Sequence, residues 1–416
     1  MRGRLPPVLR ERDYSLLLGG AIAYGLGREM VFVAVGWQVY DISRNPFHLG
    51  LVGLAEFLPL LLLALPAGAI ADRLSRKLVY VGSLVADAAI TALLLVVSLG
   101  GAKSLWPFLA LSFASGCSAA VGNPAIRSMW PTLVPLQLLT SALALRSTVF
   151  QATVVVGPAV GGVLFALGPE VVYGAGVVLM LAAAALAVPI SPRTIEHAPM
   201  EIAGTRLGSL LAGLRFVRGT PVLLGAISLD LVAVLFGGAV ALLPLFARDV
   251  LDVGPVGLGI LRSAPAVGAL AAGIMLTRRP LGRRAGRTLL LVVAVFGASM
   301  VVFGLSRSFP LSFAALAVGG FVDMVSMNIR SLITALATPD ALRGRVNAVE
   351  MVFISASNEL GAFESGVAAA LVGAAPAVLF GGVATIAIAV LWWRLFPSLA
   401  QVDRLDELRP VSVEAA

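Results

Sequence analysis

Charged residues are scarce in this chain. Only 12% of its 416 residues are Asp, Glu, Lys or Arg, whereas 59% are hydrophobic. Soluble globular domains carry about 25% charged residues, so a chain this apolar cannot cover a water-facing surface with polar groups. The composition excludes an ordinary soluble domain and indicates a protein whose solvent is the lipid bilayer.

Cysteine and histidine are nearly missing as well. The chain has one Cys and two His, which excludes a disulfide framework and a clustered His or Cys metal site. Cys117 lies in an apolar run, and we interpret it as an inert buried thiol. The sequence has no nucleotide-binding motif of the Walker type, so ATP is not the expected energy source. We therefore expect neither a cofactor nor a metal.

The positive charge of the chain is distributed in short clusters. The formal net charge is +8, and the basic residues lie between apolar runs. This arrangement is typical of loops that face anionic lipid headgroups. We expect the lipid bilayer, and not nucleic acid, to be the partner of this charge.

Twelve apolar runs are long enough to cross a bilayer, which takes about 20 residues in a helix. No strand-like alternation dominates, and backbone groups in lipid must be hydrogen-bonded within their own segment, so helices are predicted. The predicted spans are 15–39, 48–71, 78–99, 105–126, 141–167, 171–190, 222–247, 255–277, 288–306, 310–334, 346–371 and 375–395.

The loop charges predict the orientation, because Lys and Arg are enriched in cytoplasmic loops. Four basic residues lie in loops on the side opposite the cytoplasm: Arg44, Lys103, Arg248 and Arg307. Four more lie within or at the ends of spans: Arg28, Arg262, Arg330 and Arg394. The remaining 22 of the 30 fall in segments that this scheme places inside. Both termini are therefore predicted to be cytoplasmic. The first apolar run is too long for a signal peptide and is predicted to be a spanning helix.

The chain is predicted to consist of two related halves. The longest polar stretch lies midway along the chain, and short matches recur across it, such as Ile126-Arg127-Ser128 and Ile329-Arg330-Ser331. Internal repeats of this kind are common in transporters. We predict an all-α membrane protein with twelve transmembrane helices in two pseudo-symmetric six-helix bundles. Its parts are an N-terminal bundle (1–190), a cytoplasmic linker (191–220), a C-terminal bundle (221–396) and a cytoplasmic tail (397–416).

The loop between the second and third spans carries a recognisable motif. The run Gly68-Ala-Ile-Ala-Asp72-Arg73-Leu-Ser-Arg76-Lys77 resembles the cytoplasmic loop signature of the major facilitator superfamily, G-x-x-x-D-R-x-x-R-K. The resemblance implies that Asp72 is a conformational latch that bonds to the start of span 346–371 when the cytoplasmic side is closed. The latch residues are Gly68, Asp72, Arg73, Arg76 and Lys77. The alternative is that the three basic residues only set the topology.

A second motif lies in span 141–167. Gly157, Pro158, Gly161 and Gly162 resemble the G-P-x-x-G-G core of the antiporter signature of proton-driven exporters, although Thr153 occupies the first glycine position of the longer signature. Proline can kink a helix, and glycines allow close helix packing. The alternative interpretation is a bent packing helix without a role in antiport.

The segment from Thr338 to Gly366 is the most distinctive of the chain. Its runs Arg343-Gly-Arg-Val-Asn347 and Ala356-Ser-Asn-Glu359-Leu-Gly-Ala-Phe-Glu364-Ser-Gly366 resemble the enterobactin exporter branch of the superfamily. The resemblance implies a monomeric, proton-coupled secondary active exporter of a small amphiphilic substrate such as an enterobactin-type siderophore. Macrolide or multidrug efflux is the alternative, because those relatives share the architecture; a non-transporting membrane sensor is a remote one. An enzyme is not expected, because no nucleophile, base or metal cluster occurs.

Charged residues inside spans supply the candidate site, since they are costly in lipid and usually face a cavity. The candidates for proton coupling or the cavity are Glu359, Glu29, Arg28, Asp323, Arg330, Glu364, Glu56 and Asp230. Glu359 lies near mid-span and is the preferred proton carrier, with Glu29 second; each acid has a structural role as its alternative. Arg330 is expected to bond another helix, because about 10 Å of helical rise separates it from Asp323. Asp87 also lies in a span, one that the superfamily layout places at the periphery.

Overall fold

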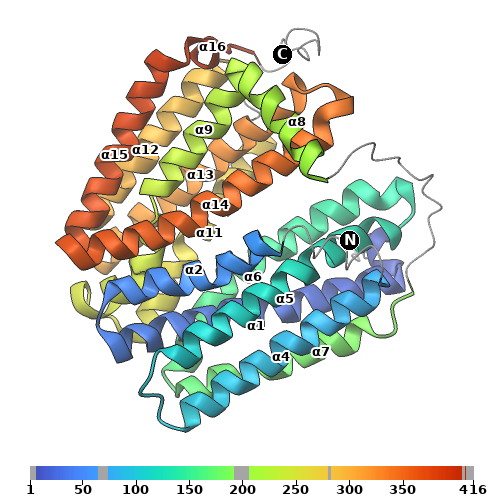
Figure 1. The fold of residues 1–416 in the computed structure, drawn as a ribbon, viewed down its shortest axis with the longest axis vertical. Helices are drawn as coiled ribbons and strands as arrows, with labels where there is room; N and C mark the ends of the chain where they lie inside the picture. The colour runs from blue at the N-terminus through green and yellow to red at the C-terminus, as the bar shows by residue number, and fades with distance from the viewer. Residues whose placement is uncertain (1–5, 64–73, 192–205, 280–282, 405–407, 409–416) are drawn as a thin grey trace, which may run out of the picture. The chain divides into compact units, whose positions relative to one another are not determined.

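The computed structural model describes residues 6–63, 74–191, 206–279, 283–404 and 408, and these residues form helices and no strand (Figure 1). Ten helical segments are long and apolar enough to cross a membrane. Two further helices coincide with predicted spans: α2 (Pro46–Leu62) is shorter, and α14 (Asp340–Val372) is long but is not among the ten. The prediction of an all-helical membrane protein is confirmed for the described residues.

The chain divides into two compact units. Unit 1 comprises Met1–Met200 and Val253–Ser263, and unit 2 comprises Glu201–Asp252 and Ala264–Ala416. The long helices of unit 1 are α1 (Arg12–Ser43), α2, α4 (Arg76–Leu99), α5 (Trp106–Met129), α6 (Leu139–Phe165) and α7 (Pro169–Ala187), with the first residues of α11 (Gly254–Arg278). Tyr14 lies in the core of this unit, where its hydroxyl donates to the Ala142 carbonyl at 2.8 Å and its ring meets Trp130 edge-on.

Unit 2 contains the remaining helices. They are α8 (Arg206–Gly219), α9 (Pro221–Phe236), α10 (Leu243–Leu245), the rest of α11, α12 (Ala285–Leu305), α13 (Phe309–Ala337), α14, α15 (Ala374–Leu395) and α16 (Pro397–Ala400). Helix α8 lies within the predicted linker and packs on α14: a Cβ added at Gly213 would lie 2.7 Å from the Arg345 carbonyl oxygen. After α16, the Asp403 side chain accepts the Arg284 backbone N–H at 2.9 Å and so holds the tail at the start of α12.

The two units repeat one packing order. In unit 1, α1 packs on α6 and α7, and α4 packs on α5 and α7; in unit 2, α9 packs on α14 and α15, and α12 packs on α13 and α15. Glycines at matching positions lie in the contact of α1 with α6 and in the contact of α9 with α14. A Cβ at Gly157 of α6 would lie 2.6 Å from the Glu29 Cβ, and one at Gly361 of α14, 204 residues later, would lie 2.8 Å from the Val234 carbonyl oxygen. Side chains larger than hydrogen are excluded at both crossings.

The predicted span 222–247 is not one continuous helix. Helix α9 ends at Phe236, and the segment continues through the 3-10 turn Ala239–Leu242, α10 and the π-helical turn Phe246–Val250. The break falls at two glycines that face close neighbours: a Cβ at Gly238 would lie 2.6 Å from the Gly361 carbonyl oxygen. The predicted span is confirmed as a membrane-crossing segment, Pro221–Val250, and the structure adds the interruption where α14 approaches closely at Gly238.

Candidate functional site

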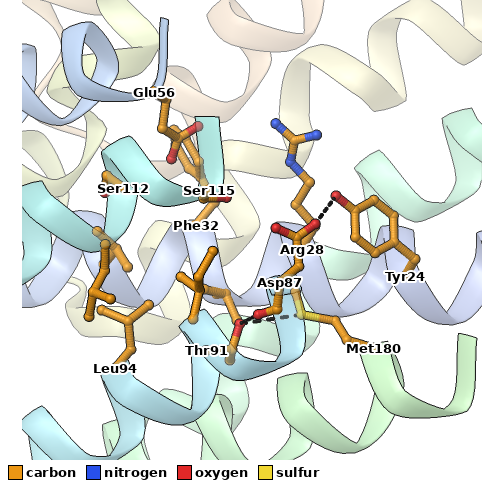
Figure 2. Close-up of a pocket in the computed structure, with 14 residues that line it drawn as sticks. Tyr24, Arg28, Phe32, Glu56, Asp87, Thr91, Leu94, Ser112, Ser115 and Met180 are labelled. Carbon is orange, nitrogen blue, oxygen red and sulfur yellow. Dashed lines mark hydrogen bonds between the residues drawn. The ribbon is translucent and has the colours of Figure 1, made fainter. Parts of the chain in front are cut away.

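A small cavity lined by apolar side chains and a few charged and polar ones lies inside unit 1 (Figure 2). Its volume is about 40 Å³, and its walls come from α1, α2, α4, α5 and α7. Two of the predicted site residues, Arg28 of α1 and Glu56 of α2, line it. Asp87 of α4 and Tyr24 of α1, which the sequence did not single out as site residues, line it too.

Asp87 and Tyr24 form the central contact of this cavity. The Tyr24 hydroxyl donates to Asp87 Oδ2 at 2.9 Å (Figure 2). Tyr24 and Arg28 are four residues apart and thus share one face of α1. Asp87 is 5% exposed, and its Oδ1 has no hydrogen-bond partner among the described residues. Arg28 and Glu56 are half-buried, and within the described part of the chain no ion pair joins Arg28 to either carboxyl group.

Glu29 lies against the glycine motif and does not line this cavity. Gly161 approaches the α1 backbone, where an added Cβ would lie 2.8 Å from the Met30 Cα. Gly162 approaches the start of α11, with a Cβ 3.0 Å from the Gly259 Cα. The close packing predicted for Gly157, Gly161 and Gly162 is confirmed, and Pro158 is buried among them. Their role in antiport stays a prediction.

A second group of charges lies in unit 2. Arg330 of α13 forms a buried ion pair with Asp230 of α9; the two residues are 5% and 8% exposed. Arg330 therefore bonds another helix, as predicted, and not Asp323 of its own helix. Asp323 is exposed, and it lines a cavity of about 20 Å³ together with Asp230 and Ser326.

The acids of α14 lie apart from both cavities. Glu359 and Glu364 are half-buried in unit 2, and neither lines the cavity beside Asp230. The Ser357 hydroxyl donates to the Ile354 carbonyl at 3.0 Å, so it satisfies its own helix instead of Glu359. The structure thus brings Arg28 together with Glu56, and Asp230 with Arg330 and Asp323, while Glu359 stays a prediction from its position in the span.

Most of the predicted latch lies outside the described residues, namely Gly68, Asp72 and Arg73. Arg76 and Lys77 begin α4, behind Ser75, whose side chain caps the helix by accepting the Leu78 N–H at 3.2 Å. On the expected partner, Val346 is buried and Asn347 is exposed on α14. The latch remains an expectation from the loop motif.

Sequence reasoning missed Asp87 because it lies in a span expected to be peripheral. The signal was present: Asp87 is the single charged residue between the basic start and the end of α4. A lone acid in an otherwise apolar helix has to find a partner inside the bundle. The tyrosine that supplies this partner, 63 positions earlier, has no sequence signature of its own.

Comparisons with known proteins agree with an exporter. A family model described as transmembrane secretion effector matches residues 5–411. The multidrug efflux pump Tap of Mycolicibacterium fortuitum is 29% identical over 368 residues, which cover 84% of this chain and 88% of the pump. The enterobactin exporter EntS of Escherichia coli is 28% identical over 333 residues, which cover 76% of this chain and 75% of that exporter.

Solved transporter structures share the fold. A bacterial homologue of the human lysosomal transporter Spinster superposes with a TM-score of 0.71 at 16% identity, over 96% of this chain and 97% of that one. The nucleoside transporter NupG superposes with a TM-score of 0.72 at 13% identity, over 92% of this chain and all of that one. At these identities the likeness concerns the fold alone.

Proposed function

Because the chain belongs to the transmembrane secretion effectors, a family of major facilitator transporters and not of enzymes, we propose that it is a proton-coupled secondary active exporter that works by alternating access. The observation that carries the proposal is the family match over residues 5–411. Charged residues enclosed by apolar helices in both units support the coupling to protons, because such groups commonly mark ion and substrate paths.

The proposed architecture has twelve transmembrane helices in two pseudo-symmetric bundles, residues 1–190 and 221–396. Between them lies a cytoplasmic linker (191–220), and a cytoplasmic tail (397–416) follows. We assign the two spans beyond the ten apolar ones to helices α2 and α14. The repeated packing order of the two units supports this arrangement. We propose a monomer in a bacterial inner membrane with both termini in the cytoplasm.

The proposed substrate is a siderophore of the enterobactin type. The motifs of α14 resemble that branch, and EntS covers most of the chain. The similar identity to the pump Tap makes drug efflux the second candidate.

We expect cells that express the chain to retain less enterobactin than cells that carry an empty vector, with erythromycin retention changed less. The measurement is intracellular accumulation of both compounds in a strain without its own exporters. Dissipating the proton gradient should raise accumulation to the vector level. Lower erythromycin but unchanged enterobactin would favour the drug-efflux alternative. Unchanged retention of both compounds would contradict export of either class.

The latch motif gives a prediction of its own. Asp72→Asn keeps the side-chain shape and removes its charge, so we expect folded protein at the wild-type level and transport reduced roughly 5- to 150-fold, the range of a 1–3 kcal/mol conformational coupling. Initial efflux rates, normalised to the amount of folded protein, measure the effect. Wild-type rates in this variant would show that the loop motif has no conformational role here.

A further inference from the structure

We propose that Asp87 is a proton-binding carboxyl group inside unit 1, with Tyr24 as its fixed hydrogen-bond donor and Arg28 as the charge that responds to its protonation. The inference deepens the proposed exporter by naming a proton site, and it rests on the proposed function for its role in transport. The binding of the proton itself can be measured without any substrate.

Only one of the two carboxyl oxygens of Asp87 has a hydrogen-bond partner among the described residues. One carboxyl oxygen accepts from Tyr24 at 2.9 Å, while the other, buried among α1, α4 and α5, has no partner among the described residues. Leaving a buried polar atom unpaired is costly, and a buried unpaired charge is more costly. A carboxyl group in this position is therefore stabilised by a proton on its free oxygen or by a cation close to it.

Arg28 is the cation that the cavity itself supplies. It lies one turn from Tyr24 on α1 and lines the same cavity as Asp87 and Glu56, with its guanidinium pointing away from the Asp87–Tyr24 contact (Figure 2). Within the described residues it forms an ion pair with neither carboxyl group. The structure thus shows a separated arrangement, in which Arg28 is near two acids and bonded to neither.

The other groups around the cavity do not replace Arg28. The helices packed against α4 face the cavity with Ser112 and Ser115 of α5 and Met180 of α7, which carry no charge. The remaining titratable or charged groups near the site are Tyr24, Glu29, Glu56, Tyr80 and Arg262; the last of these lies 4.0 Å above the Phe32 ring, which lines the cavity.

Two states follow from this set. With a proton on Oδ1, Asp87 is neutral and Arg28 stays apart from it. When the proton leaves to water, the carboxylate and the guanidinium attract each other across a small cavity of low polarity, where the attraction is stronger than in bulk water. A metal cation is the poorer ligand, because Arg28 would repel it and a cavity of about 40 Å³ has room for little more than a water molecule.

The test is infrared difference spectroscopy of the full-length protein in liposomes, recorded as the pH is lowered. We expect a band of a buried protonated carboxyl group that Asp87→Asn removes. Tyr24→Phe keeps the ring and removes the donor, so it should shift the band without removing it. Asp41→Asn is the matched control, because Asp41 is an exposed acid at the end of α1. If Asp87→Asn fails to fold, the shift of the carboxyl band in Tyr24→Phe alone tests the proton site.

Export of enterobactin and erythromycin driven by a pH gradient is measured in the same liposomes. Loss of both the band and gradient-driven export in Asp87→Asn supports the site and its role. If Asp87→Asn folds and its carboxyl bands match those of the wild type, the proton site is overturned, even if the wild type exports substrate. If Asp87→Asn does not fold, unchanged carboxyl bands in Tyr24→Phe overturn the site instead. If Asp87→Asn loses the band but wild-type export does not depend on the pH gradient, the result supports the proton site and overturns the proposed coupling to protons.

Discussion

Replacing Arg330 by methionine should lower the free energy of unfolding by about 3–5 kcal/mol, because Asp230 would be left as an unpaired charge in the interior of unit 2. Asp230→Leu should lower the free energy of unfolding by a similar amount, because it leaves the Arg330 guanidinium buried without its partner. The double variant Asp230→Leu/Arg330→Met should recover most of the loss, since apolar residues of similar volume often replace a buried ion pair at little cost. Denaturant-induced unfolding in detergent micelles measures all three variants.

A second ion pair in unit 2 provides the matched control. Arg343 and Asp340 of α14 are joined at 2.7 Å, but both side chains are exposed. Arg343→Met should therefore cost less than about 1 kcal/mol, the usual value of a surface pair. Equal losses for Arg330→Met and Arg343→Met, or a double variant as unstable as the sum of the single ones, would contradict a stabilising pair between α9 and α13.

Glu359→Gln should abolish efflux driven by a pH gradient while sparing substrate exchange at equal pH. The variant keeps the size and hydrogen-bonding capacity of the side chain but cannot carry a proton, and exchange requires no net proton movement. The measurement compares gradient-driven export and equal-pH exchange of enterobactin in the same liposomes.

Glu364→Gln controls for the loss of an acid elsewhere on α14. The two positions are five residues apart, about 140° around the helix, so they face different surroundings. Gradient-driven efflux that is retained in this variant but lost in Glu359→Gln would assign the coupling to Glu359 and not to the second candidate acid of α14. If Glu359→Gln still moves enterobactin against its gradient, the residue is structural, and the coupling carboxyl lies elsewhere, with Asp87 and Glu29 the next to replace.

The helical spans could be predicted from the sequence because hydropathy and helix length act along one segment at a time. The interruption after Phe236 could not. It depends on how closely α14 approaches at Gly238, a contact between residues more than 120 positions apart. The glycines of α6 were an intermediate case: their spacing indicated close packing, but only the structure identifies α1 and the start of α11 as their partners.

The sequence predicted most of the charged residues of the two cavities, but it did not predict which of these residues lie together. The cost of a charge in lipid singled out Arg28, Glu56, Asp230 and Arg330 from their positions inside apolar spans. It could not pair Arg330 with Asp230, because two helices 100 residues apart supply them. Asp87 was set aside because its helix was expected to be peripheral, whereas the Tyr24 hydroxyl of α1 donates a hydrogen bond to it. Which charges meet depends on helix packing.

Proton movement caused by substrate alone is the most direct measurement of proton-coupled export. Liposomes containing the purified protein and an internal pH dye receive a gradient of the compound that the cell assay identifies, enterobactin or erythromycin, with no initial pH difference. We predict that substrate flow in one direction drives protons in the other and that Glu359→Gln eliminates this signal. Substrate equilibration in the wild type with no change of internal pH would contradict proton-coupled export.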